Sequence, residues 1–175
     1  MGKISVASYE AKYKSAFESL NRAWIEKFFR IEPADEYLLQ NPEETVIGTG
    51  GAILIALDDC IAAGVVGLRK INNDEYEMIK MAVSEQYQGQ GIGNILGKAI
   101  IEEAAKLGAR KVILYSNTSL KPALSLYNKL GFVQVPLEPD NDYIRSDIKM
   151  ELLIDNSASS YRNNNQNRQE PNAVF

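Results

Sequence analysis

The stretch QYQGQGIGNIL, residues 86–96, decides how the rest of this chain is interpreted. It places Gly89, Gly91 and Gly93 between an apolar run and a segment with helical periodicity. Each glycine weakens regular structure by roughly 0.5 to 1 kcal/mol relative to alanine. In return, small residues before a helix let backbone N–H groups approach an anion, and the helix N-terminus adds free donors. The spacing predicts a phosphate cradle, with a turn needed only for tight packing as the alternative.

Two common nucleotide-phosphate motifs do not match this stretch. A P-loop needs Gly-Lys-Ser/Thr at its end, whereas Asn94 and Ile95 follow Gly93. The dinucleotide fingerprint G-x-G-x-x-G opens a βαβ unit near the start of its domain, whereas this loop has a different spacing and lies halfway along the chain. Neither motif therefore explains the loop, and a phosphate cradle and a turn needed only for tight packing both stay open.

One protein family combines such a loop with a second motif. Residues 88–93, QGQGIG, resemble the Q/R-x-x-G-x-G/A signature of the GNAT superfamily of acyl-CoA-dependent N-acetyltransferases. Residues 123–132, ALSLYNKLGF, resemble the family's A-x-x-L-Y-x-K-x-G-F ending. The resemblance covers residues 75–135 in motif detail and 1–154 in the order of elements. It implies one acetyltransferase domain at 1–154, followed by a polar tail at 155–175.

Hydrophobic periodicity predicts elements in an order that fits this family. Helices are expected at 10–29, 33–39, 92–107 and 122–130. Strands are expected at 3–9, in a hairpin over 52–68 that turns at Asp58-Asp59, and at 75–83, 111–115, 132–135 and 148–154. Strands alternating with helices after a run of hairpins predict an α/β or α+β layout. The resemblance implies a three-layer fold, with a mixed, mostly antiparallel sheet of six to seven strands flanked by about four helices.

The composition excludes several classes of function. Histidine is absent from all 175 residues and Cys60 is the one cysteine, which removes Ser-His and Cys-His nucleophile pairs and most zinc sites. No metal cofactor is therefore expected. The net charge of −4 argues against a nucleic-acid partner. The apolar runs are strand-sized, so no membrane span is expected. Without the apolar core of a signal peptide, a cytoplasmic protein is the default.

The resemblance implies acetyl-CoA as cosubstrate. The glycine loop and the following helix would hold the pyrophosphate of coenzyme A, mainly through backbone N–H groups. The end of the preceding strand would pair with the pantetheine arm, and a splay from the strand at 112–116 would admit it. Gln88 stands where the family usually has arginine, a common variant. The residues implied for binding are Met81, Ala82, Val83, Gln88, Gly89, Gln90, Gly91, Ile92, Gly93, Asn94 and Asn117, the last at an unusually long spacing from the second motif.

Acetyl transfer to an amine needs a neutral amine, donors for the oxyanion and a proton for the departing thiolate. Tyr127 matches the family tyrosine that protonates the sulfur, and a phenol of pKa about 10 is protonated at neutral pH. Glu77 stands where many relatives carry the glutamate that takes the amine proton. Glu75 and water are the alternative bases. The oxyanion donor is expected to be the backbone N–H of Ala82 or Val83.

The sequence also offers a candidate nucleophile, Cys60, and a group of candidate residues for the acceptor pocket. Cys60 offers a competing route through an acyl-cysteine, but a buried, inert thiol is expected because nothing basic is near it in sequence. An acceptor pocket is expected in the N-terminal third, although Trp24 and Phe28 are expected in the core of the first helix. The candidate pocket residues are Trp24, Phe28, Phe29, Asp35, Glu36 and Tyr37, with Asn141, Asp142 and Tyr143 as a possible rim.

The sequence therefore predicts an enzyme that moves an acetyl group from acetyl-CoA to a primary amine of a small molecule or peptide, by direct attack in a ternary complex. One alternative is a non-catalytic acyl-CoA-binding module that senses or regulates. Another is a protein acetyltransferase whose asparagine-rich tail recruits a partner. A homodimer is consistent with the resemblance, because members of the family often form them.

Overall fold

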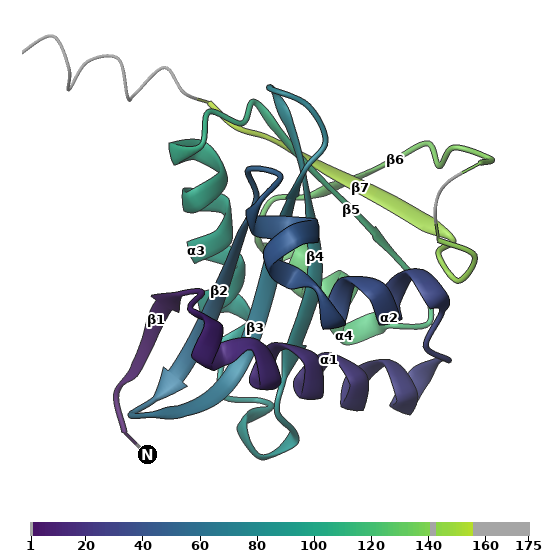
Figure 1. Cartoon of the computed structure of the whole chain (residues 1–175). Coiled ribbons are helices and arrows are strands. Elements are labelled where there is room, and N and C mark those ends of the chain that lie inside the picture. Colours follow the sequence, from purple (N-terminus) through teal and green to yellow (C-terminus); the bar gives the residue numbers. More distant parts are fainter. Residues whose placement is uncertain (1, 141–142, 156–175) are drawn as a thin grey trace, which may run out of the picture.

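The computed structural model of the chain describes residues 2–140 and 143–155 (Figure 1). Seven strands form one sheet in the order β1-β2-β3-β4-β5-β7-β6, and among these strands only β4 and β5 pair in parallel. The strands are β1 (Ile4–Ser8), β2 (Ala52–Asp58), β3 (Ile61–Lys70), β4 (Glu75–Val83), β5 (Lys111–Ser116), β6 (Val133–Val135) and β7 (Ile148–Leu153). This mixed, mostly antiparallel sheet confirms the predicted fold class.

Four α-helices flank the sheet in the described part of the chain. They are α1 (Lys14–Phe28), α2 (Pro33–Gln40), α3 (Ile92–Lys106) and α4 (Lys121–Lys129), accompanied by the short helical turns η1 (Ala11–Tyr13), η2 (Glu43–Ile47) and η3 (Glu85–Tyr87). The turn η2 is π-helical and was not predicted. Residues 156–175 of the predicted polar tail lie outside the described residues.

The helices form a layer on each face of the sheet. Figure 1 shows α1 and α2 over one face and α3 over the other, and α4 packs beside α3. In β2, Leu54 and Ala56 belong to the core beneath α3, whereas Ile53 and Ile55 belong to the core beneath α1. Because both faces are covered, this strand is a continuous apolar run rather than an alternating one.

The structure differs from the prediction in two details of the helices α1 and α3. Phe28 of α1 is 49% exposed, because the buried face of this helix runs through Phe17, Asn21 and Ile25. The polar Asn21 conceals that face in the sequence; its side chain is satisfied by donating to the Phe17 carbonyl at 2.9 Å. The helix α3 ends at Lys106, one residue before the end predicted at 107, and Leu107 is exposed.

The predicted hairpin is present, but its cysteine is not buried. β2 and β3 are joined by Asp59 and Cys60, and Asp59 has a positive φ of 54°. The side chain of Cys60 is exposed. The prediction of a buried thiol is therefore wrong, because a two-residue turn at the end of a hairpin leaves its side chains in solvent.

The strands β4 and β5 separate after a short paired stretch. Pairing runs from Glu75 opposite Lys111 to Glu77 opposite Ile113 and then stops. On its other edge β4 contains a bulge, because the three steps from Ile79 to Ala82 face only two steps of β3. The bulge includes Lys80, which has a positive φ of 51°. The splay expected from the family resemblance thus exists. Among the described residues, the edge of β4 that faces β5 has no strand partner from Met78 to Val83.

Candidate active site

The glycine loop lies between η3 and the N-terminus of α3. Gly89 and Gly91 have φ values of 76° and 80°, and Gly91 is the N-cap of α3. A Cβ built on either residue would meet no atom within 4 Å. Glycine is therefore needed at these two positions because it adopts the left-handed backbone conformation without strain, and the backbone beside them faces open space.

The loop presents a continuous series of unused donors. The backbone N–H groups from Gly89 to Asn94 donate no hydrogen bond to any described residue, and the first helical bond runs from the Ile95 N–H to the Gly91 carbonyl at 3.1 Å. The Gln88 and Gln90 side chains point back to the carbonyls of Val83 and Gln86, at 3.2 and 2.9 Å. Donors at the positive end of a helix dipole suit a phosphate group.

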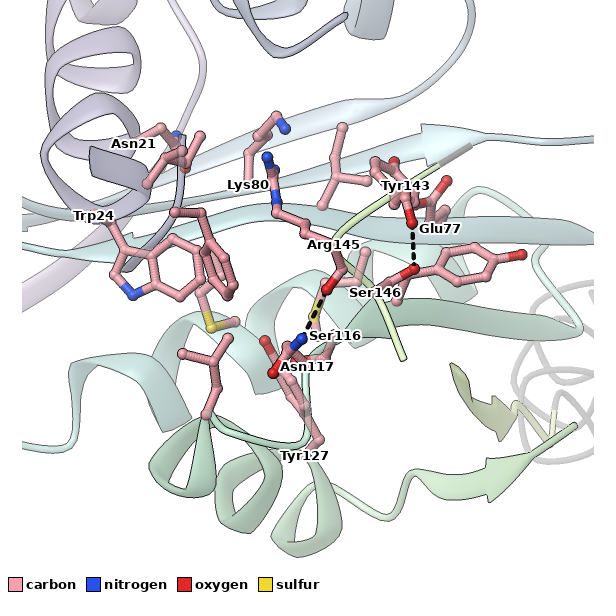
Figure 2. A pocket seen from close by; sticks show the side chains of 17 residues that line it. Asn21, Trp24, Glu77, Lys80, Ser116, Asn117, Tyr127, Tyr143, Arg145 and Ser146 are labelled. Carbon is pink, nitrogen blue, oxygen red and sulfur yellow. Dashed lines mark hydrogen bonds between the residues drawn. The ribbon is translucent and has the colours of Figure 1, made fainter. Parts of the chain in front are cut away.

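A pocket opens where β4 and β5 part (Figure 2). Its walls come from α1, the second half of β4, the end of β5, α4 and the segment just before β7. Of the predicted site residues, Glu77, Met81, Asn117 and Tyr127 line it. The glycine loop follows the end of β4, so the loop and the pocket lie along one open strand edge.

Glu77 is almost completely buried, at 1% exposure. Its Oε2 accepts bonds from Arg69 Nε at 3.1 Å and Nη2 at 2.5 Å, and its Oε1 accepts one from the Tyr143 hydroxyl at 2.7 Å. The alternative base, Glu75, is paired with Lys111 at 2.9 Å and is not a pocket residue. The geometry therefore favours Glu77 over Glu75.

Tyr127 reaches the pocket from α4, and its ring meets Phe132 edge to face at 6.3 Å between centroids. Its hydroxyl makes no hydrogen bond to any described residue. Burial raises the pKa of Tyr127 to about 12, because the charged phenolate is disfavoured away from water. The group is therefore protonated at neutral pH and has its proton available.

Asn117 has its amide engaged within the protein. Its Nδ2 donates to the Arg145 carbonyl at 2.8 Å, and its Oδ1 accepts from the Ser119 N–H at 2.9 Å. Figure 2 shows the first of these bonds at the end of the pocket near Tyr127. Asn117 thus joins the end of β5 to the segment before β7, and contact with a cosubstrate stays a prediction.

The sequence analysis missed two cations that line the pocket, Lys80 and Arg145. Both donate to Asp35, which is 4% exposed; Arg145 Nη1 and Nη2 approach its oxygens at 2.6 and 2.9 Å. Burial by itself would raise the pKa of Asp35, but the bonds from Arg145 and Lys80 hold it well below its usual range. Burial lowers the pKa of Lys80, and Asp35 opposes that change.

The predicted acceptor residues divide between the pocket and the surface. Trp24, Phe29 and Tyr143 line the pocket, whereas Glu36 pairs with Arg22 and Tyr37 bonds to Glu44 outside it. Phe28 lies on the surface beside it. Asn141 and Asp142 lie outside the described residues. In the described ranges, no group of three or more metal-binding side chains is placed to hold an ion, and no helix is long and apolar enough to span a membrane.

A model of the acetyltransferase (GNAT) family matches residues 13–132, more than half of the chain. The chain belongs to this family. GNAT enzymes are acyl-CoA-dependent acetyltransferases, and the family assignment confirms the resemblance read from the two motifs.

Curated relatives of this GNAT chain differ in acceptor. N-Acetylaspartate synthetase of Homo sapiens is 28% identical over 114 residues, which cover 63% of this chain and 35% of that enzyme. The ribosomal protein bS18 alanine N-acetyltransferase of Escherichia coli K12 is 28% identical over 131 residues, covering 75% of this chain and 78% of that enzyme. The chain thus spans about a third of the human enzyme and about three quarters of the bacterial one.

Solved GNAT structures share the fold. An acetyltransferase from Staphylococcus aureus Mu50 has a TM-score of 0.76 at 18% identity, over 85% of this chain and 98% of that one. A Bacillus subtilis acetyltransferase in complex with CoA has a TM-score of 0.67 at 23% identity, over 87% of this chain and 99% of that one. At these identities the likeness concerns the fold, and residue roles are argued from the site itself.

Proposed function

We propose that this GNAT chain transfers an acetyl group from acetyl-CoA to a primary amine by direct attack while both substrates are bound. One observation carries the proposal: the unused N–H groups of residues 89–94 follow the end of β4, and the unpaired edge of β4 opens onto a pocket that contains Glu77 and Tyr127. Acetyl-CoA, when bound, supplies the acetyl group as an activated thioester.

The glycine loop and α3 would bind the phosphates of coenzyme A. Charge-assisted hydrogen bonds contribute roughly 1.5 to 3 kcal/mol each, whereas an exposed helix dipole contributes about 0.3 to 1 kcal/mol. Several backbone bonds from Gly89 to Asn94 therefore supply most of the phosphate affinity. The unpaired edge at Met81–Val83 offers backbone groups to the pantetheine amides.

Glu77 would accept the proton of the attacking amine. Its Oε2 is occupied by Arg69, so Oε1, which accepts a bond from the Tyr143 hydroxyl, is the oxygen that receives the proton. The proton arrives directly or through one water. Arg69 holds the carboxylate in place during the transfer.

Tyr127 would donate a proton to the departing sulfur, since its phenol stays protonated and its hydroxyl is otherwise unengaged. Negative charge that develops on the acetyl oxygen needs a backbone donor. Ala82 and Val83 are consecutive strand residues, so one of their N–H groups points away from β3 toward the open edge. That N–H is the proposed donor.

The test combines calorimetry with turnover. Acetyl-CoA is titrated into wild-type protein and Tyr127→Phe, and thiol release is followed with a panel of amines. We expect both proteins to bind acetyl-CoA equally and the variant to lose most of its turnover. Equal turnover would remove Tyr127 from the mechanism. Tight binding without acetylation of any amine would favour the sensor module over the enzyme.

The same assay tests the domain boundary. We propose that residues 1–154 form the complete acetyltransferase domain, because the seven described strands end at Leu153. A chain ending at residue 155 should keep its turnover of small amines. Loss of that turnover, with retained folding, would show that residues 156–175 belong to the functional unit.

A further inference from the structure

The acceptor end of the pocket contains more positive charge than its nearest carboxylate can balance. Lys80 and Arg145 line the pocket and share one buried carboxylate, Asp35. Their side chains are only 8% and 19% exposed. Buried charges need partners, because the protein interior solvates them poorly. Among the described residues, Asp35 is thus the one carboxylate bonded to both cations, and it balances one of their two charges.

The other carboxylates nearby offset this positive charge only in part. Glu77 also lines the pocket, but its charge is matched by Arg69, whose Nη2 lies at 2.5 Å. Glu32 approaches Arg145 only to 3.8 Å, is 26% exposed, and borders the surface hollow beside the pocket rather than the pocket itself. Lys80 and Arg145, which line the pocket, are therefore not fully balanced by buried carboxylates of the described residues.

The same two side chains have unused hydrogen-bond donors. A guanidinium carries five N–H groups and an ammonium carries three. Among the described residues, Arg145 donates to Asp35 and to the Arg30 carbonyl, and Lys80 donates to Asp35. Free donors thus remain on both groups, and a carboxylate is the group that accepts from a guanidinium and an ammonium most strongly.

Arg145 also restricts the size of the acceptor. It connects the segment before β7 to Asp35 of α2 and, at 3.4 Å, to the Arg30 carbonyl between α1 and α2. Aromatic pairs stand on either side: Trp24 with Phe29, and Tyr115 with Tyr143. In Figure 2, the guanidinium of Arg145 lies beside Lys80, at the other end of the residue from the carbonyl that accepts from Asn117. The bridge favours a short molecule over an extended polypeptide.

We propose that the acceptor is a small amine that also carries a carboxylate, an amino-acid-like compound whose anion binds Lys80 and Arg145 while its amine faces Glu77. This inference rests on the proposed acetyltransferase function and names its substrate class. The Asp35 carboxylate then acts as a positioning group, since it holds both cations at the pocket wall without touching the acceptor.

The experiment compares matched acceptors on the wild-type protein. Free amino acids and their carboxamides are assayed with acetyl-CoA, together with a short peptide, and release of the CoA thiol is measured. The carboxamide removes the anion and also makes the amine less basic, which by itself favours the amide. We expect kcat/KM to be about 10- to 150-fold higher for the acids, the effect of one charge-assisted hydrogen bond of roughly 1.5 to 3 kcal/mol.

Two variants sharpen the result. Arg145→Gln should reduce the preference of acid over amide toward unity, whereas Arg110→Gln, which removes the same charge at a 78% exposed position outside the pocket, should leave it unchanged. The wild-type comparison decides the matter even if Arg145→Gln does not fold. If the amides or the peptide are acetylated as efficiently as the acids, the inference about the acceptor is overturned and the proposed function stands. Acetyl-CoA binding with no acceptor acetylated would overturn the proposed function, and the inference with it.

Discussion

The phosphate cradle can be tested by one substitution at each end of the same helix. Gly91 precedes α3 and Gly108 follows it, with φ values of 80° and 89°. A Cβ on either glycine would meet no atom within 4 Å. Gly91→Ala and Gly108→Ala therefore impose the same conformational strain and no clash within the protein. They differ only in that Gly91 borders the unused N–H groups.

The magnitudes follow from that difference. An L-residue in the left-handed region costs roughly 1 to 2 kcal/mol, which lowers the Tm of a chain of this size by about 2 to 8 °C. Both variants should show that loss. In Gly91→Ala the methyl group also enters the space beside the donors. Losing one charge-assisted phosphate bond of roughly 1.5 to 3 kcal/mol should weaken acetyl-CoA binding by about 10- to 150-fold.

Isothermal titration with acetyl-CoA, alongside thermal unfolding of each variant, measures both effects. We expect Gly108→Ala to bind as the wild type does while sharing the Tm loss. Equal affinity in the two variants would refute the cradle. The glycines would then serve the turn alone, and the enzyme proposal would lose its main support.

Three further predictions concern charged and phenolic groups. Glu77→Gln should lower kcat by about 10² to 10⁴-fold with little change in acetyl-CoA affinity, because a general base contributes that much; a fall below tenfold in steady-state assays would assign Glu77 a structural role. Asp35→Asn should cost about 3 to 5 kcal/mol at pH 7, since Lys80 and Arg145 lose their shared carboxylate. Because the folded-state pKa of Asp35 is lowered, its stabilisation is present above the unfolded pKa of about 4 and declines below it; denaturant curves that keep a constant difference from pH 7 to below pH 4 would contradict this. The raised pKa of Tyr127, about 12, predicts no loss of kcat between about pH 8 and pH 10 through this group, so a descending limb there that disappears in Tyr127→Phe would show that the phenol ionises earlier.

The sequence was most informative where structure depends on neighbouring residues. The left-handed glycines at 89 and 91 lie in the predicted loop, and the turn at Asp59-Cys60 lies one residue after the hairpin turn predicted at Asp58-Asp59. Turns and helix ends are set by backbone preferences within a few residues, so a single sequence carries the signal. The two motifs indicated the family, and with it the expected order of helices and strands along the chain.

Side-chain exposure was less predictable. Two sets of residues in α1 are spaced so that either could form its buried face: Phe17, Trp24 and Phe28, or Phe17, Asn21 and Ile25. The helix packs on β3 and β4 with the second set buried. Apolarity could not decide between the two, since a buried asparagine is stable once its amide is bonded, as it is here. Cys60 was misplaced for a different reason: with the turn predicted at Asp58-Asp59 it falls at the start of a strand, whereas in the structure it belongs to the turn itself.

The sequence by itself thus determined the element order, the glycine loop and the presence of Glu77 and Tyr127. Only the tertiary structure decided what surrounds them. Lys80 joins Asp35 across 45 positions of sequence and Arg145 joins it across 110. Neither Lys80 nor Arg145 belongs to a sequence motif. The backbone conformation at Lys80 is set by the bulge in β4. Such pairs form because distant segments bury their charges together, and no local pattern records which segments will meet.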